Sequence, residues 1–282
     1  MTIYLKTVHF DIEDEIVSFS GKSYELLDRI GSGGNGAVYE CIDSSGSIYA
    51  VKFLLQLSPK NQKRFEQEIS LLERINHPHI IRYIDKGKVD TVNSKGLAVE
   101  LPFVIMERAD RNLVEYLRSV ESVPYEIYAA QFRGLCEALA EIHKVAIHRD
   151  IKPENVLIKG ETWVISDFGL CTFLDPEERR EITKPNEKIG PAFWMSPEAV
   201  DCCYFENDLI DTYSDVFQLC AVFAFVLTKR FPGGVIDEKV NLNTTKEIQG
   251  VILSSLSNNY RQRPQNGNEL VCRYNDATYK RE

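Results

Sequence analysis

The strongest constraint on the fold is a change in hydrophobic pattern near residue 107. From Tyr24 up to that point, apolar residues form short strand-like segments, and after it they recur at the three- and four-residue spacing of helices. The 282 residues lie near the size at which single cores stop growing, so one body divided into two lobes is natural. We therefore predict an α+β fold: a small antiparallel-sheet lobe with one main helix over residues 24–107, and a larger helical lobe over residues 111–275.

Local patterns predict the individual elements. Five strands are predicted over residues 24–30, 37–42, 48–55, 79–87 and 101–108. Helices are predicted over residues 60–76, 111–119, 125–144, 216–228 and 245–257. Ser58 and Pro59 supply an N-cap and a first-turn proline for the first helix. Residues 1–23 are an extension with one strand over residues 3–10 and no assigned function, and residues 276–282 form a tail.

Composition narrows the class of protein. Apolar residues (44%) and charged residues (27%) are typical of a globular chain, and the formal net charge of −9 argues against nucleic-acid binding. Seven cysteines without a C-x-x-C pair fit a reduced cytoplasmic protein better than a disulfide framework or a zinc site. The longest apolar stretch, residues 216–228, has 13 residues, against about 20 for a membrane span, and predicts a helix buried on all sides. We expect a cytoplasmic protein without a signal peptide or membrane span; its oligomeric state stays open.

A glycine-rich hairpin joins the first two predicted strands. Gly31, Gly33 and Gly36 are followed by Val38. Because these glycines lie between two strands, they disfavour the dinucleotide-binding crossover, in which glycines join a strand to a helix. A hairpin without Cβ atoms can lie over a triphosphate and offer its backbone N–H groups. Taken alone, the pattern also fits a flexible hairpin without a ligand.

The third predicted strand carries a candidate phosphate-binding lysine. Ala50 and Lys52 are two residues apart and therefore share one face of the strand. Ala50 leaves room for a planar base, Val38 is a candidate opposite wall, and Lys52 can reach the phosphates. A buried ammonium needs a counter-charge, and Glu68 on the following helix is the expected partner.

The candidate catalytic groups lie within twenty residues of each other. The sequence HRDIKPEN over residues 148–155 is followed by DFG over residues 167–169. Phosphoryl transfer depends on positioning and charge neutralisation, and Mg²⁺ takes hard oxygen ligands. Asn155 and Asp167 are the candidate metal ligands, Asp150 is the candidate base for the attacking hydroxyl, and Lys152 is placed to stabilise charge on the transferred group.

Together these motifs resemble those of the eukaryotic-type protein kinases over residues 24–275. The resemblance rests on the GSGGNGAV loop, the YAVK strand, HRDIKPEN, DFG and a Ser-Pro-Glu motif at residues 196–198, which is similar to the family's Ala-Pro-Glu. It implies the bilobal protein kinase fold, a protein substrate, and ATP as donor with Mg²⁺, or alternatively Mn²⁺. It also implies nucleotide contacts from Ile30, Leu157, the gatekeeper Met106 and the hinge from Glu107 to Ala109.

The resemblance extends to residues that support the helical lobe. Asp215 resembles the aspartate that opens the family's buried central helix, and Arg263 resembles the arginine that pairs with the Glu198 equivalent. Cys220 stands where the family's central helix has glycine, and we interpret it as structural because cysteine is small and packs well. His148 is expected to pack under Phe168.

Two features leave the class of hydroxyl acceptor and the regulation open. HRDIKPEN, with Lys152, resembles the serine/threonine branch, but Pro191 replaces that branch's threonine, and Pro-x-x-Trp resembles the tyrosine branch. A tyrosine or dual-specificity kinase is therefore an alternative. Arg149 is the type of residue that pairs with an activation-loop phosphate, and Thr183 is the candidate autophosphorylation site. Two alternatives to phosphorylation stay open: nearby glutamates already supply the negative charge, or the loop is unmodified and solvated.

The sequence therefore predicts an ATP- and Mg²⁺-dependent protein kinase, most consistent with serine/threonine specificity. Asp150, Lys52, Lys152 and Glu68 are its candidate catalytic residues. Two rivals remain: a catalytically silent scaffold of the same fold, disfavoured because every catalytic position is filled, and a small-molecule kinase, disfavoured by the long segment between Asp167 and Glu198.

Overall fold

A computed structural model describes residues 1–93, 96–178, 193–205, 210–231 and 241–279. The chain divides into two compact units. The first unit comprises Met1–Asn76 and Ile81–Ala109, and the second comprises His77–Ile80 and Asp110–Glu282. An antiparallel sheet dominates the first and helices dominate the second, which confirms the predicted α+β class.

The first unit is built on a six-stranded antiparallel sheet. Its strands are β3 (Glu15–Val17), β4 (Ser23–Ser32), β5 (Gly36–Asp43), β6 (Ile48–Leu54), β7 (Tyr83–Val92) and β8 (Ala98–Glu107), in the order β3-β4-β5-β6-β8-β7. The five predicted strands are present. The fourth begins later than predicted because His77–Ile80 belongs to the second unit, where Ile80 pairs with Ile165.

The N-terminal extension differs most from its prediction. Instead of one strand it forms a hairpin of β1 (Thr2–Leu5) and β2 (Val8–Asp11), followed by β3 as the sixth strand of the sheet. Directly after β3, Ser18 pairs with Gly87 of β7, so the two edges of the sheet are joined. The prediction of a single strand was wrong because the turn at Lys6 adopts a left-handed conformation (φ 55°) without glycine, asparagine or proline to signal it.

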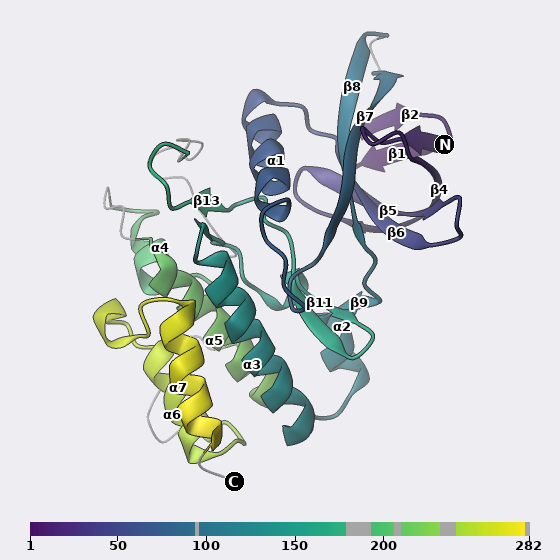
Figure 1. Ribbon diagram of the computed structural model, residues 1–282. Helices are drawn as coiled ribbons and strands as arrows, with labels where there is room; N and C mark the ends of the chain where they lie inside the picture. Colours follow the sequence, from purple (N-terminus) through teal and green to yellow (C-terminus); the bar gives the residue numbers. More distant parts are fainter. Residues whose placement is uncertain (94–95, 179–192, 206–209, 232–240, 280–282) are drawn as a thin grey trace. The chain divides into compact units, whose positions relative to one another are not determined.

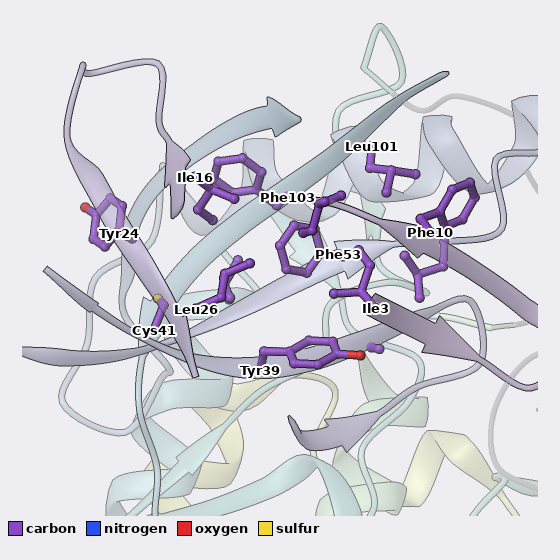
Figure 2. Close-up of a cluster of buried hydrophobic side chains, with 14 of the residues drawn as sticks. Ile3, Phe10, Ile16, Tyr24, Leu26, Tyr39, Cys41, Phe53, Leu101 and Phe103 are labelled. Atoms are coloured by element: carbon purple, nitrogen blue, oxygen red, sulfur yellow. The ribbon is translucent and has the colours of Figure 1, made fainter. Parts of the chain in front are cut away.

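Apolar side chains of this extension complete the core of the first unit. Figure 2 shows Ile3 and Phe10 of the hairpin beside Phe53, Leu101 and other side chains of the sheet. Ile3, Phe53 and Leu101 are fully buried, and Phe10 is nearly so. The extension is therefore part of the packed unit.

The opposite face of the sheet packs against α1 (Pro59–Leu72). As predicted, Ser58 caps this helix by accepting a hydrogen bond from the Asn61 N–H, and Pro59 occupies its first position. Phe65 and Ile69 of the helix pack against Leu54 of β6 and Val104 of β8. This packing directs the helix face that carries Glu68 toward the face of β6 that carries Lys52.

The second unit contains most of the helices. They are α2 (Leu113–Ser119), α3 (Tyr125–Ile142), α4 (Pro197–Asp201), α5 (Thr212–Thr228), α6 (Lys246–Ser255) and α7 (Gly267–Tyr279). Short strands accompany them: β9 (Arg111–Asn112), β10 (Ala146–Ile147), β11 (Val156–Lys159), β12 (Thr162–Ile165) and β13 (Thr172–Phe173). The 3₁₀ turns are η1 (Pro153–Asn155) and η2 (Tyr260–Gln262).

The α5 helix forms the centre of this unit. Every residue from Ser214 to Ala224 is buried, as the apolar run predicts, and Phe223 stacks on Phe132 of α3 with ring centroids 3.8 Å apart. The helix α7, which the sequence analysis did not predict, packs on α3. Their approach requires glycine at Gly267, because a Cβ there would lie 2.3 Å from the backbone nitrogen of Ala140. Within the described ranges, none of the helices has both the length and the apolar character of a membrane span.

Candidate functional site

In the first unit, the glycine-rich hairpin connects β4 to β5. The Gly33 N–H donates to the Gly36 carbonyl at 2.9 Å, and a Cβ placed on Gly33 would meet no atom within 4 Å. The space above this turn is therefore open for a ligand to approach the backbone. Gly36 has a packing reason of its own, because its Cβ would lie 2.2 Å from the Phe53 carbonyl oxygen of β6.

Strand register gathers the candidate nucleotide contacts on one face of the sheet. Val38 of β5 lies opposite Lys52 of β6, and Ala50 lies opposite Met106 of β8. Because cross-strand partners share a face, these four side chains line the same side of the sheet, as the sequence predicts for Ala50 and Lys52. Gly31 is Val38's other cross-strand neighbour and closes this row toward β4.

Lys52 and Glu68 form the predicted ion pair. The Lys52 Nζ donates to Glu68 Oε1 at 2.6 Å. The Glu68 side chain is only 3% exposed, whereas Lys52 keeps 15% of its side-chain surface accessible to solvent. The pair therefore fixes the direction of an ammonium group that a ligand can still reach.

The remaining candidates of this unit lie at or near the ends of strands or at the end of the unit. Ile30 is 44% exposed at the end of β4, next to the glycine-rich hairpin. Glu107 ends β8; its N–H donates to the Arg82 carbonyl at 3.0 Å, and its carboxylate pairs with the Arg82 side chain, also at 3.0 Å. Ala109 is the last residue of the unit.

In the second unit, a hydrogen-bond network holds the Asp150 carboxylate. The Lys152 Nζ lies 2.9 Å from Asp150 Oδ2 and 3.2 Å from Oδ1. The Asn155 Nδ2 donates both to this carboxylate at 2.8 Å and to the Asp150 backbone carbonyl at 2.9 Å. Burial raises the pKa of Asp150, while the neighbouring Lys152 ammonium acts to lower it. A carboxylate of raised pKa accepts a proton more readily than an ordinary aspartate.

The two candidate metal ligands are coupled through Ser166. Its N–H and hydroxyl both donate to the Asn155 carbonyl, at 2.8 and 2.9 Å, and Asp167 follows directly with a left-handed backbone (φ 61°). Both Nδ2 hydrogens of Asn155 are engaged by Asp150, so Oδ1 is the side-chain atom left to accept a cation. An amide oxygen and a carboxylate are hard ligands that suit Mg²⁺, and the residues therefore fit a divalent cation.

The structure also places Phe168 and Leu157, two further residues singled out in the sequence. Phe168 is fully buried against His148, with ring centroids 4.7 Å apart. Leu157 of β11 is half-buried and pairs with Asn112 of β9.

Asp215 organises the backbone that precedes Asp150. Its carboxylate accepts the N–H groups of His148 at 2.6 Å and Arg149 at 2.8 Å. Arg149 adopts φ 67°, a strained conformation that these hydrogen bonds stabilise. Burial alone would raise the pKa of Asp215, but its hydrogen bonds and the nearby histidines outweigh burial and hold the pKa below its usual range.

Sequence reasoning missed the role of His143. Its Nε2 lies 3.0 Å from Asp215 Oδ2, and its Nδ1 accepts the Gly267 N–H at 2.9 Å. Because Nδ1 accepts a hydrogen bond, the ring proton lies on Nε2 and points at Asp215. No local pattern marks His143, since its partners are 72 and 124 residues away.

A second buried ion pair lies at the start of α4. Arg263 donates from both of its terminal nitrogens to Glu198, at 2.7 and 2.9 Å, which confirms the predicted pair. The Ser214 hydroxyl of α5 also donates to this carboxylate at 2.7 Å. Cys220 of α5 is fully buried, consistent with a structural role. Thr183 and Pro191 lie outside the described residues, so the predictions that involve them stay predictions.

Comparison with known proteins gives one family throughout. The family model described as "Protein kinase domain" matches residues 24–275. A probable serine/threonine-protein kinase of Clostridium perfringens is 26% identical over 269 residues, which cover 89% of this chain and 38% of that protein. Serine/threonine-protein kinase A of Synechocystis is 31% identical over 229 residues, covering 74% of this chain and 41% of that protein. A probable serine/threonine-protein kinase of Streptomyces coelicolor is 32% identical over 219 residues, covering 75% and 31%. The chain thus spans less than half the length of these relatives.

Proposed function

Because this chain belongs to the protein kinase family, we propose that it transfers the γ-phosphoryl group of ATP to serine or threonine hydroxyls of a protein substrate. The observation that carries this proposal is the Asp150 network. A buried carboxylate of raised pKa is held by an ammonium two residues away and by an amide five residues away. The amide belongs to Asn155, one of the two candidate metal ligands. This constellation suits proton removal from a hydroxyl during phosphoryl transfer.

The two units contribute different groups to the proposed reaction. In the first, the glycine-rich hairpin binds phosphate oxygens through its backbone, Lys52 contacts the phosphates and Glu68 orients Lys52. In the second, Asp150 accepts the proton of the substrate hydroxyl and Lys152 stabilises negative charge on the transferred group. Asn155 and Asp167 would hold Mg²⁺, or Mn²⁺, which supplies neutralisation of the phosphate charge when bound.

Serine/threonine specificity is supported by the names of the relatives and by Lys152. Its ammonium contacts both carboxylate oxygens of Asp150, so this clamp forms without a hydroxyl from position 191. A cytoplasmic location is supported by the seven cysteines, which form no disulfide among the described residues, as a reducing compartment would keep them.

The test is transfer of label from γ-labelled ATP in the presence of Mg²⁺. Replacing Asp150 by Ala should lower the transfer rate roughly 10²–10⁴-fold, the scale of a positioned general base, while nucleotide binding persists. Asp276→Asn, an exposed carboxylate on α7, is the matched control and should transfer at the wild-type rate. Near-normal transfer by Asp150→Ala would contradict the proposed base.

Phosphoamino-acid analysis of the labelled protein tests the class of acceptor. Label on serine or threonine supports the proposal, and label on tyrosine favours the tyrosine or dual-specificity alternative. A folded wild-type protein that binds ATP yet transfers no label to proteins or small molecules would instead be a scaffold.

A further inference from the structure

The N-terminal hairpin of β1 and β2 contacts β4 and β5, the strands of the glycine-rich hairpin. The turn of that hairpin, residues 31–36, is called the glycine-rich loop below. It is fixed to the first unit at its far end, where the Thr91 hydroxyl of β7 donates to the Asp11 carbonyl of β2 at 2.6 Å. Ile3 of β1 is fully buried among the core residues of the sheet (Figure 2). The hairpin is therefore held in place on the sheet, and its other residues can contact the neighbouring strands.

Its first link to the loop passes through Arg29 of β4. The Arg29 guanidinium lies over the Tyr4 ring, 4.3 Å from the ring centroid, within the range of a cation–π interaction. The Arg29 Nε donates to the carbonyl oxygen of Gly31, the first glycine of the loop, at 3.4 Å. Arg29 also sits between two register shifts of the β4–β5 pair, where the ladder itself constrains the backbone least.

A second link reaches the strand on the other side of the loop. The backbone N–H of Tyr4 donates to the hydroxyl of Tyr39 at 3.1 Å. Tyr39 belongs to β5, three residues after Gly36, and is 1% exposed. The same hairpin residue thus contacts both strands that flank the loop.

We propose that Tyr4 and Arg29 are positioning residues for nucleotide binding, acting through the glycine-rich loop. A loop of this composition loses conformational freedom when it settles over phosphates, and an element that holds both of its stems reduces that cost. The hairpin then preorganises the loop through the two strands that flank it. The expected effect on ATP binding rests on the proposed function. The ordering of the loop by the hairpin does not.

Hydrogen exchange without nucleotide tests the structural part. Replacing Tyr4 by Ala removes the ring beneath Arg29 and should speed the exchange of the amides at residues 31–36. Tyr4→Phe keeps the ring and should exchange like the wild type, and so should Thr2→Ala, which removes only the exposed hydrogen bond from Thr2 to Asp11 on the same hairpin. Unchanged exchange at residues 31–36 in Tyr4→Ala would overturn the proposal whether or not the protein binds ATP.

Steady-state kinetics test the consequence for ATP. We expect Tyr4→Ala to raise KM for ATP about two- to fivefold, the scale of an exposed cation–π contact, and to leave kcat within about twofold of wild type. Arg29→Ala should raise KM at least as much, and the double variant no more than Arg29→Ala alone, because both changes break one link. Tyr39→Phe tests the second link and should raise KM independently.

A merely structural role predicts a different pattern. If the hairpin only covers the core, Tyr4→Ala lowers the melting temperature and the folded fraction but does not raise KM for ATP more than it lowers kcat. Tyr4→Phe then does not restore wild-type loop exchange or KM. Either result would overturn the proposal. If Tyr4→Ala speeds the exchange of the loop amides but the wild-type protein does not bind ATP, the proposed function is contradicted. The effect of the hairpin on the loop is then established all the same.

Discussion

Each unit of the molecule contains a buried glutamate paired with a cation, and these two pairs are built differently. In the first unit Glu68 accepts a hydrogen bond from the ammonium of Lys52, and 15% of the lysine side chain stays accessible. In the second unit Glu198 meets the planar fork of Arg263 through two contacts, and the arginine side chain is 0% exposed. A rotatable ammonium can turn to a phosphate while it keeps its carboxylate, whereas a bidentate guanidinium is committed to one carboxylate. The first pair therefore suits ligand binding, and the second suits structure.

The largest effect is expected from breaking the structural pair. Arg263→Met leaves a buried glutamate without its guanidinium and should lower the free energy of unfolding by about 3–5 kcal/mol, the usual cost of removing one partner of a buried pair. Chemical denaturation monitored by tryptophan fluorescence measures this change.

The double variant Arg263→Met with Glu198→Leu sharpens that result. Exchanging both partners for apolar residues removes the desolvated charges, so most of the lost stability should return. A double variant as unstable as Arg263→Met would show that the hydrogen bonds from Arg263 to other groups, such as the Ser257 carbonyl, carry the effect.

The corresponding change in the first unit should affect activity more than stability. Lys52→Met should lower the phosphoryl-transfer rate roughly 10²–10³-fold, the scale of losing one electrostatic contact to a reacting group. The double variant Lys52→Met with Glu68→Gln removes both charges and should recover stability without recovering activity. If the double variant regained activity, Lys52 would have no role toward the phosphates.

The sequence predicted the two pairs because each is marked by local pattern or by family motif. Alternation along β6 places Lys52 on the face that also bears Leu54, and the helical period of α1 places Glu68 beside Phe65 and Ile69. Strand register and helix packing then bring the two charges together without further information.

What the sequence did not predict depends on contacts between distant segments. The helix α7 presents few apolar residues to define a period, and Leu270 and Tyr274 are buried because α7 packs against α3 and other helices of its unit. His143 acquires its role from Asp215 and Gly267, which no spacing connects to it. The N-terminal hairpin turns at Lys6, a residue type that does not signal a turn.

A smaller effect is expected when Lys52 keeps its charge and loses its orientation. Glu68→Gln preserves the shape of the side chain and removes its negative charge, so Lys52 is held less firmly. We expect the transfer rate to fall about tenfold, less than the roughly 10²-fold that an ångström of misplacement costs. Glu66→Gln, on the exposed face of the same helix, is the control and should change the rate little. Equal losses in both variants would mean that α1 itself, and not the pair, is perturbed.

A further effect concerns the pH dependence of the structural pair. Burial acts to raise the pKa of Glu198, but Arg263 and the Ser214 hydroxyl outweigh burial, and the pKa lies below its ordinary value. A depressed carboxylate pKa stabilises the folded state above the unfolded pKa of about 4.3, and that contribution is lost as pH falls through the folded value.

Ser214→Ala removes one of the hydrogen bonds that depress this pKa. It should cost about 1.5–3 kcal/mol of unfolding free energy at pH 7, the range for a hydrogen bond to a charged group, and the difference from wild type should shrink as pH falls below about 4. Thr245→Ala is the matched control, because it also deletes a hydroxyl at a helix N-terminus, where Thr245 accepts the Ile248 N–H, but contacts no buried carboxylate in the described structure. Its cost of about 1 kcal/mol should not vary with pH. In the α5 cap the Ser214 hydroxyl also accepts the Asp211 N–H at 3.3 Å. Parallel pH curves for the two variants would show that Ser214 acts only through this cap, and that Arg263 alone keeps Glu198 ionised.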